Sequence, residues 1–347
     1  MSKSRDIADV ATGIDITGTV DATAFTGDGS GLTGLPAGYT NADVAAYLAA
    51  GVTGNVSIDG GTIKLDGNYP VGTNNVALGD TALSSVTSTG NSNTAVGYLA
   101  ARNVTTGSTN TAVGNAALSS LTTGGSNTAI GHLALSANTA SNNTAVGSGA
   151  SLNNTTGTHN ISVGSNSQLN NTTGEANTTL GSASLQANVT GSYNVALGRE
   201  ALVASTVSNN TAVGYRALPF NTTGVYNTAL GGRESGNYSV LNLNTTGSYN
   251  VGVGAGSLGK NTTASSNTAV GYQASYSNTT GTPNTSVGYA SLKLNTTGGN
   301  NNAFGFNSLA ANTTGGQNIA MGGSSLAGNT TGSNNTAIGD AALASNT

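Results

Sequence analysis

Few residues in this chain are able to carry catalysis, and their spacing does not bring them together. Only two histidines occur, His132 and His159, and they lie nearly two repeats apart at different repeat positions. Of the 13 acidic residues, none forms within the repeats a close carboxylate pair of the kind that glycosidases use. We therefore interpret the histidines as surface residues and predict no catalytic residue and no enzyme activity.

Cofactor and metal sites are not indicated either. The absence of cysteine excludes disulfides, thiol catalysis and Cys-ligated metals. Calcium-binding β-roll repeats need an Asp in each turn, and the turns here carry none. The periodic glycines are not followed by Lys, as they are in phosphate-binding loops. We expect neither a metal nor another cofactor.

Charge and hydropathy exclude two further kinds of partner. Six of the nine Lys and Arg residues are scattered singly along the repeats, so they form no basic face for nucleic acid. No stretch approaches the ~20 apolar residues of a membrane span, and the start, Met1–Asp6, has no apolar signal region. The sequence predicts no nucleic-acid partner and no membrane span.

Aromatic side chains at one repeat position are better candidates for ligand contact. Tyr272, Tyr289 and Phe306 recur once per repeat, and Tyr98 and Tyr215 share their position elsewhere. A sugar-binding strip is one interpretation of such a row, and a packing ladder that stiffens a rod is the favoured one. At the next position, Glu200 and Arg216 can pair between repeats, although an exposed pair contributes little.

One insertion, Gly232 to Asn242, breaks the repeat. It contains Arg233, Glu234 and Tyr238. Insertions in repeat arrays map to loops on one face and often carry function; a simple bulge is equally well supported. The candidate surface contacts are therefore the three aromatic residues of the row and these three residues.

A recurring five-residue motif, which we call the word, defines all these repeat positions. Asn301-Asn302-Ala303-Phe304-Gly305 is one copy. Sixteen copies occur, starting at Asn75, Asn93, Asn110, Asn127, Asn143, Asn160, Asn177, Asn194, Asn210, Asn227, Asn250, Asn267, Asn284, Asn301, Asn318 and Asn335. Most are 17 residues apart, with single-residue slips near Asn143 and Asn210 and six extra residues after Gly231. A fixed period of this size is the signature of a repeat architecture.

We number each repeat from this Asn, as column zero. Column one is mostly Thr, Val or Ile, column three is a larger apolar residue, column two is nearly always Ala or Ser, and column four is always Gly. Alternation with β-branched residues predicts a strand. We expect columns one and three to point into the core and the small residues to face a neighbouring surface. The glycine predicts a positive φ or a place with no room for Cβ.

The second half of the repeat predicts another strand and another turn. Column eight is Leu in eleven copies, after Ala or Ser in column seven, and Asn-Thr-Thr-Gly follows, as at 295–298. Strand, turn, strand and turn make one coil, so we predict an all-β parallel β-solenoid (β-roll) of about sixteen 17-residue coils at ~4.8 Å spacing. The Asn columns should form ladders of side-chain amides, an explanation that we prefer to N-glycosylation of the Asn-Thr-Thr words. Ice binding by the Thr of column one is disfavoured, because we expect that column to face inward.

Three segments are expected along the chain. Residues 1–36 read as an attachment segment of short strands, 37–74 as a short helix and hairpin, and 75–347 as the solenoid shaft. The helix spans Asn41 to Ala50, with Val44, Tyr47 and Leu48 as an apolar stripe for trimerisation. Because roughly three apolar side chains per coil barely offset the ordering entropy, we expect a homotrimer.

Two resemblances extend this interpretation. The word Asn-Thr-Ala-Val-Gly, as at 93–97, resembles the head repeats of trimeric autotransporter adhesins, which are trimeric parallel β-rolls. The stretch from Thr19 to Leu35 resembles a segment of bacteriophage tail fibres, especially those of marine phages, and Tyr39 to Leu48 is similar to another. The resemblance implies a phage tail fibre in the virion. It would be attached through its N-terminus to a baseplate or another fibre protein, associate with itself as a trimer, and contact host surface glycans. The alternative is a bacterial extracellular adhesin or a self-polymerising surface filament. Because the array stops at Ala344 to Thr347, inside its next turn, we expect either that a C-terminal chaperone is removed or that chains join end to end.

Overall fold

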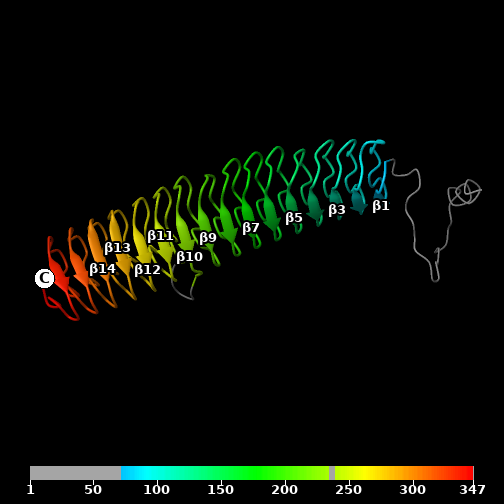
Figure 1. Cartoon of the computed structure of the whole chain (residues 1–347). Helices are drawn as coiled ribbons and strands as arrows, with labels where there is room; N and C mark the ends of the chain where they lie inside the picture. The colour runs from blue at the N-terminus through cyan, green and yellow to red at the C-terminus, as the bar shows by residue number, and fades with distance from the viewer. Residues whose placement is uncertain (1–71, 234–238, 347) are drawn as a thin grey trace, which may run out of the picture. The chain divides into compact units, whose positions relative to one another are not determined.

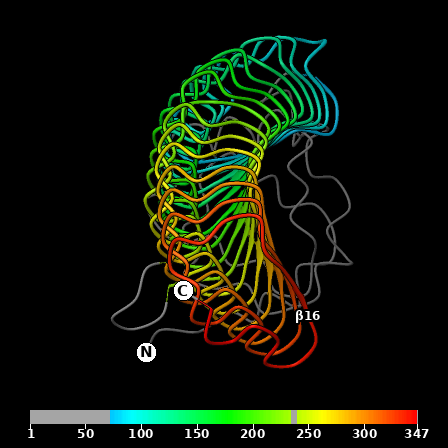
Figure 2. The ribbon, with the colours of Figure 1, turned by 90° about the vertical axis from the view of Figure 1, so that its left-hand side faces the viewer.

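The computed structural model describes residues 72–233 and 239–346, which all belong to the second of the chain's two units, Lys64–Thr347. These residues form a stack of coils, each giving one short strand to a single sheet (Figure 1). Seen along the stack, the coils lie one behind another and rotate gradually (Figure 2). The predicted parallel β-solenoid is confirmed. The expected attachment segment, helix and hairpin, with Val44, Tyr47 and Leu48, lie outside the described residues.

The sheet contains sixteen strands in chain order, and all neighbours are parallel. The strands are β1 (Val76–Leu78), β2 (Thr94–Val96), β3 (Thr111–Val113), β4 (Thr128–Ile130), β5 (Thr144–Val146), β6 (Ile161–Val163), β7 (Thr178–Leu180), β8 (Val195–Leu197), β9 (Thr211–Val213), β10 (Thr228–Leu230), β11 (Val251–Val253), β12 (Thr268–Val270), β13 (Asn284–Val287), β14 (Asn301–Phe304), β15 (Ile319–Met321) and β16 (Thr336–Ile338). Each column pairs with itself in the next coil, even across the insertion, where Thr228 lies opposite Val251. Differences in coil length are therefore absorbed in the turns.

The column-four glycine ends each strand for both of the expected reasons. Its φ lies between +109° and +145° throughout the stack, a range that other residues rarely adopt. At Gly181, a Cβ would also lie 2.5 Å from the carbonyl carbon of Gly198 in the next coil. The close stacking of coils at this corner depends on the missing side chain.

The return half of each coil is a series of turns, so the predicted second strand is wrong. In the coil of β3, residues 115–120 are turns, and Ala116 and Leu118 have left-handed φ values of 54° and 53°. Ala117 and Leu118 are both fully buried although they are adjacent. Adjacent residues of a strand point to opposite faces, so burial of both requires the turn conformation.

The sidedness expected for the strand is also wrong. The column-two residue points into the core, where Ala95, Ala112 and Ala129 have no exposed surface, while columns one and three point outward. In column three, Leu180 is 53 % exposed and Ile338 71 %. The Leu of column eight fills the core opposite the strand, which leaves room only for a small residue in column two. Column one therefore does not face inward, and its orientation is no argument against ice binding.

Two groups of polar side chains divide the core into three apolar segments. In the first group, Ser162 is 2.6 Å from Ser151 and donates to Oε1 of Gln168 at 2.8 Å, and Nε2 of Gln168 donates to Asn160. The second is a pair, Ser275 and Ser286, 2.8 Å apart. Gln168 and the two column-eight serines replace the usual Leu, and the facing column-two Ser supplies the hydrogen bond that each then needs when buried.

The column-zero asparagines form the predicted ladder. From Asn93 to Asn335, each backbone N–H donates to the side-chain oxygen of the Asn one coil earlier, at 2.8–3.1 Å. The side-chain nitrogen donates to the turn backbone, as from Asn177 to the carbonyl of Gly191 at 2.9 Å. Buried amides thus satisfy the backbone groups that the strands leave unpaired.

A second ladder runs through the Asn of the Asn-Thr-Thr-Gly turns. In nine of these asparagines Nδ2 donates to the preceding Asn Oδ1 at 2.7–3.0 Å and to the carbonyl three residues ahead, as Asn171 does to Asn154 and Gly174. The ladder is interrupted at Ser205, which lies between Asn188 and Asn221 and whose buried hydroxyl has no hydrogen-bond partner.

Replacing Ser205 with Asn is expected to stabilise the protein by about 1–2 kcal/mol, because the longer amide can reach both neighbouring asparagines. Asn138 shows the fit: it occupies the same position in the other 16-residue coil, donating to the Ala140 carbonyl at 2.9 Å and accepting from Asn154 at 2.7 Å. The denaturation midpoint in urea measures the effect. Ser205→Ala, which only removes the unpaired hydroxyl, should change it little. A lower midpoint for Ser205→Asn would contradict the prediction.

Candidate binding surfaces

The aromatic row of column five is a closed stack. Ring centroids lie 5.4 Å apart between Tyr272 and Tyr289 and 5.3 Å apart between Tyr289 and Phe306, with interplanar angles of 18° and 15°. Because neighbouring rings already lie at stacking distance, no space for a further ring remains between them. The row thus has the geometry of a packing ladder and offers no continuous flat platform for sugar rings.

A second aromatic column was missed in the sequence. It precedes the Asn of column zero, and we call it column minus one; it holds Tyr193, Tyr226 and Tyr249. Tyr226 and Tyr249 stack at 5.2 Å and 8°, and all three side chains are more than half exposed. The sequence does contain this pattern, since each of the three tyrosines directly precedes a column-zero Asn. A repeat that is counted from that Asn places them at the end of the preceding coil, where coil lengths differ.

Tyr193 is oriented by an acidic side chain. Its hydroxyl donates to Oε1 of Glu175, one coil earlier, at 2.9 Å. This hydrogen bond, together with the negative charge of Glu175, raises the pKa of Tyr193 above its usual value. A tyrosine is protonated at neutral pH in any case, and the raised pKa extends this to more alkaline pH, so the phenol continues to donate.

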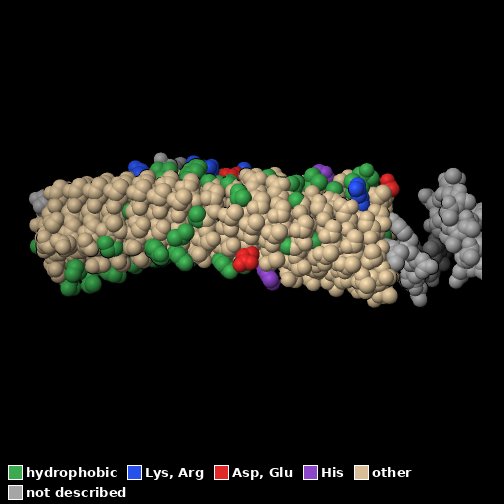
Figure 3. All heavy atoms as spheres, turned by 90° about the horizontal axis from the view of Figure 1, so that it is seen from above, with side chains coloured by type: hydrophobic (Ala, Val, Ile, Leu, Met, Phe, Trp, Pro, Cys, Tyr) green, Lys and Arg blue, Asp and Glu red, His purple; other side chains and the backbone are tan. Residues whose placement is uncertain are grey.

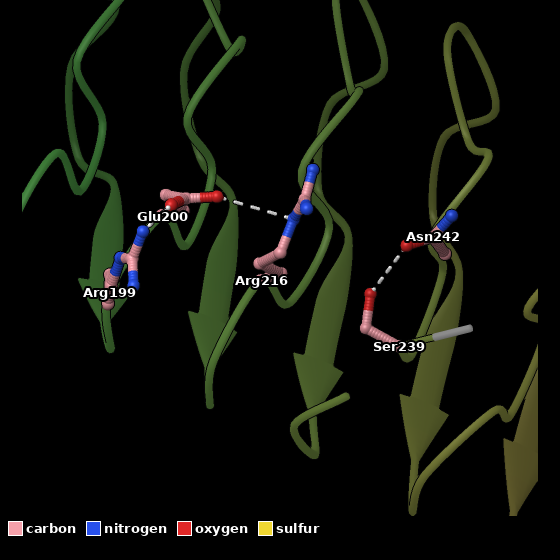
Figure 4. A network of polar contacts seen from close by, with 5 residues as sticks. All are labelled: Arg199, Glu200, Arg216, Ser239 and Asn242. Carbon is pink, nitrogen blue, oxygen red and sulfur yellow. Dashed lines mark hydrogen bonds and ion pairs between the residues drawn. The ribbon is translucent and has the colours of Figure 1, made fainter. Parts of the chain in front are cut away.

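The densest charge in the described part lies at one corner of two successive coils (Figure 4). Glu200 lies between two guanidinium groups, 2.8 Å from Nη2 of Arg199 and 3.3 Å from Nε of Arg216. The guanidinium of Arg199 lies over the ring of Tyr215, and that of Arg216 over Phe220, at 5.8 and 5.9 Å from the ring centres. The predicted pairing of Glu200 with Arg216 is confirmed. Glu200 and Arg216 are half-buried, whereas Arg199 is exposed, so its own pair with Glu200 contributes little to stability.

The insertion leaves the stack intact. Arg233 at its start is exposed, while Glu234 and Tyr238 lie outside the described residues. After it, Ser239 donates to Oδ1 of Asn242 at 2.9 Å (Figure 4), and Leu241 takes the buried position of a column-eight Leu. The chain thus re-enters the repeat pattern directly after the undescribed residues.

Titratable groups do not converge elsewhere in 72–233 and 239–346. These residues contain no group of three His, Cys, Asp or Glu side chains placed to hold a metal ion. Nδ1 of His159 lies 3.1 Å from the Thr158 hydroxyl. On the face that Figure 3 shows, charged side chains are few and most of the surface is uncharged polar groups and backbone. No helix in this part is long and apolar enough to cross a membrane.

Comparisons with known proteins return nothing that names a function. No family model, curated protein or solved structure matches the chain.

Proposed function

We propose that this chain is a structural fibre protein whose solenoid forms the shaft of a homotrimeric rod, as in a phage tail fibre that carries host adhesion. The observation that carries the proposal is the outer face of the sheet. Column three is apolar in all sixteen strands, and neither column three nor column one contains a charged residue. A continuous apolar strip on a protein surface usually marks an interface, and interface cores are depleted in charge.

The occupant that fits this face is another copy of the same chain. The sixteen strands at ~4.8 Å spacing and three residues at ~3.3 Å give a face of roughly 700 Å². Three such faces around one axis bury roughly 2,100 Å² in total, within the size range of stable protein interfaces. Three copies around one axis close the assembly and leave no apolar face open.

The tail-fibre role is supported by the resemblance of the segments at 19–35 and 39–48, and the rod by the unbroken stack. No converging set of titratable groups in the described residues suggests chemistry instead. The protein would then act through its length and through many weak surface contacts along it.

Charged residues on the outer sheet face are expected to break the trimer. Sedimentation of the full chain should give three times the chain mass of 33.6 kDa, and the double variant Val270→Lys with Val287→Lys should sediment as a monomer, since neither ammonium group can be buried unpaired. Thr280→Lys with Thr297→Lys places the same charges on exposed turns and should leave the trimer intact. A monomeric wild-type chain at micromolar concentration would contradict the trimer.

Antibody labelling then distinguishes the two biological settings. Label on the tail of phage particles supports the tail fibre, whereas label on the bacterial surface without particles replaces it with the adhesin or filament.

A further inference from the structure

Column minus one alternates rings with smaller residues. Successive coils place His159, Ala176, Tyr193, Asn209 and Tyr226 in it, followed by Tyr249. Tyr193, Asn209 and Tyr226 share a left-handed backbone, with φ values of 60°, 64° and 57°, so their side chains leave the coil in similar directions. The backbone N–H of Asn209 donates to the Ser192 carbonyl at 3.0 Å, which places its coil directly after that of Tyr193.

Asn209 therefore occupies a place in the column where a ring is missing. Rings in adjacent coils lie 5.2 Å apart, as Tyr226 and Tyr249 show. Two such steps separate the rings of Tyr193 and Tyr226 by roughly 10 Å, consistent with two strand spacings of ~4.8 Å. That separation admits one additional ring at ordinary stacking distance from both tyrosines.

The two walls of this gap are held in place from outside it. Tyr226 is backed by the parallel ring of Tyr249. Tyr193 is held on its other side by its hydrogen bond to Glu175, which belongs to the preceding coil. On that side the column residue is Ala176, which has no polar side-chain group, so the space over Asn209 is the one that offers a hydrogen-bonding side chain.

The polar groups around the gap match a polyhydroxylated ligand. Within the described residues the half-buried side-chain amide of Asn209 makes no hydrogen bond, so it offers both a donor and an acceptor. The exposed carboxylate of Glu175, on the far side of Tyr193 from the gap, uses one oxygen for Tyr193 and keeps the other for solvent. A pyranose ring presents C–H groups on its faces and hydroxyls on its edge, whereas a planar aromatic ligand would leave the amide unused.

We propose that the gap between Tyr193 and Tyr226 is a saccharide-binding site, with the sugar ring between the two tyrosines and its hydroxyls on Asn209. The electron-rich ring faces attract the C–H groups of the sugar, and the amide fixes its orientation. A saccharide is the class of ligand that a host-contacting shaft would recognise, so this proposal rests on the proposed function. In a trimer three copies of the site would lie at the same height, which multiplies weak individual contacts.

The test is to fill the gap while keeping both tyrosines. Asn209→Tyr should complete the column from Tyr193 to Tyr249 and close the site. The replacement suits the backbone, because Tyr already occupies this conformation in three other coils. Tetrasaccharides of N-acetylglucosamine, glucose and galactose serve as probes, and saturation-transfer NMR and calorimetry on the full chain measure binding. We expect wild type to bind at least one probe and Asn209→Tyr to bind it at least tenfold more weakly.

Two controls use the same chemistry elsewhere. Asn300→Tyr adds a ring to the same column, at φ 58°, far from the gap, and Tyr272→Ala opens the closed row of column five; both should bind like wild type. Wild type that binds none of the probes, or Asn209→Tyr that binds as well as wild type, would overturn the site. Sedimentation of the same samples separates the two proposals: a trimer without sugar binding overturns the site alone, and a monomer that binds sugar overturns the shaft alone.

Discussion

Asn177→Ala is expected to cost roughly 3–6 kcal/mol of unfolding free energy, because one side chain satisfies several buried groups that the substitution leaves unpaired. Its oxygen accepts from the backbone N–H of Asn194 at 2.9 Å and from Nδ2 of Asn194 at 3.1 Å. Its nitrogen donates to the Gly191 carbonyl at 2.9 Å. Asn177 has no exposed surface, so water does not replace these bonds without opening the coil.

Urea denaturation followed by circular dichroism measures this loss, and hydrogen exchange should locate it in the coils of β7 and β8. The matched control is Asn115→Ala, which removes the same side chain from an exposed position with no hydrogen-bond partner among the described residues. If the two variants were equally stable, the ladder would not be a source of stability.

Gly181→Ala is the second large expected effect, a loss of roughly 3 kcal/mol or more. Alanine at a φ of +133° is strained by ~1–3 kcal/mol. Its Cβ would also lie 2.5 Å from the carbonyl carbon of Gly198 and 2.7 Å from the backbone nitrogen of Arg199. Backbone atoms in the next coil have no rotamer to change, so relief requires the two coils to separate.

Thermal and urea midpoints of Gly181→Ala should fall well below those of Gly323→Ala. At Gly323 φ is not positive, and the nearest atom to an added Cβ is Oδ1 of Asp340, at the end of an exposed side chain that can move. A Gly181→Ala protein as stable as the Gly323→Ala protein would show that the coils tolerate wider spacing at this corner.

The period of the sequence predicts most of the fold, because a fixed repeat with Gly and Asn at fixed columns allows few structures. Which face of the strand points into the core could not be predicted from the period. Alternation says that columns one and three share a face, and hydrophobicity suggested that the face was inward. The choice depends on column eight: Leu118 and its equivalents, held in turns with left-handed φ, already fill the core and leave space only for Ala. No pattern in the sequence predicts this left-handed conformation of Leu.

The candidate site shows a related limit. The row of Tyr272, Tyr289 and Phe306 was identified because its members share one column. The same regular recurrence brings the rings to stacking distance, so no space for a ligand remains between them. The open pair, Tyr193 and Tyr226, is separated by a coil without a ring and by a one-residue slip in the period. An interruption of a pattern is harder to recognise in a sequence than the pattern itself.

The two asparagine ladders have a consequence for the conditions under which the stack survives. Both consist of neutral amides, so their hydrogen bonds neither gain nor lose a proton across the range in which carboxylates and imidazoles titrate. Nor are they screened by dissolved salt as ion pairs are. The amide framework of the stack is thus uncoupled from the acidity and salinity of its medium, from fresh water to brine.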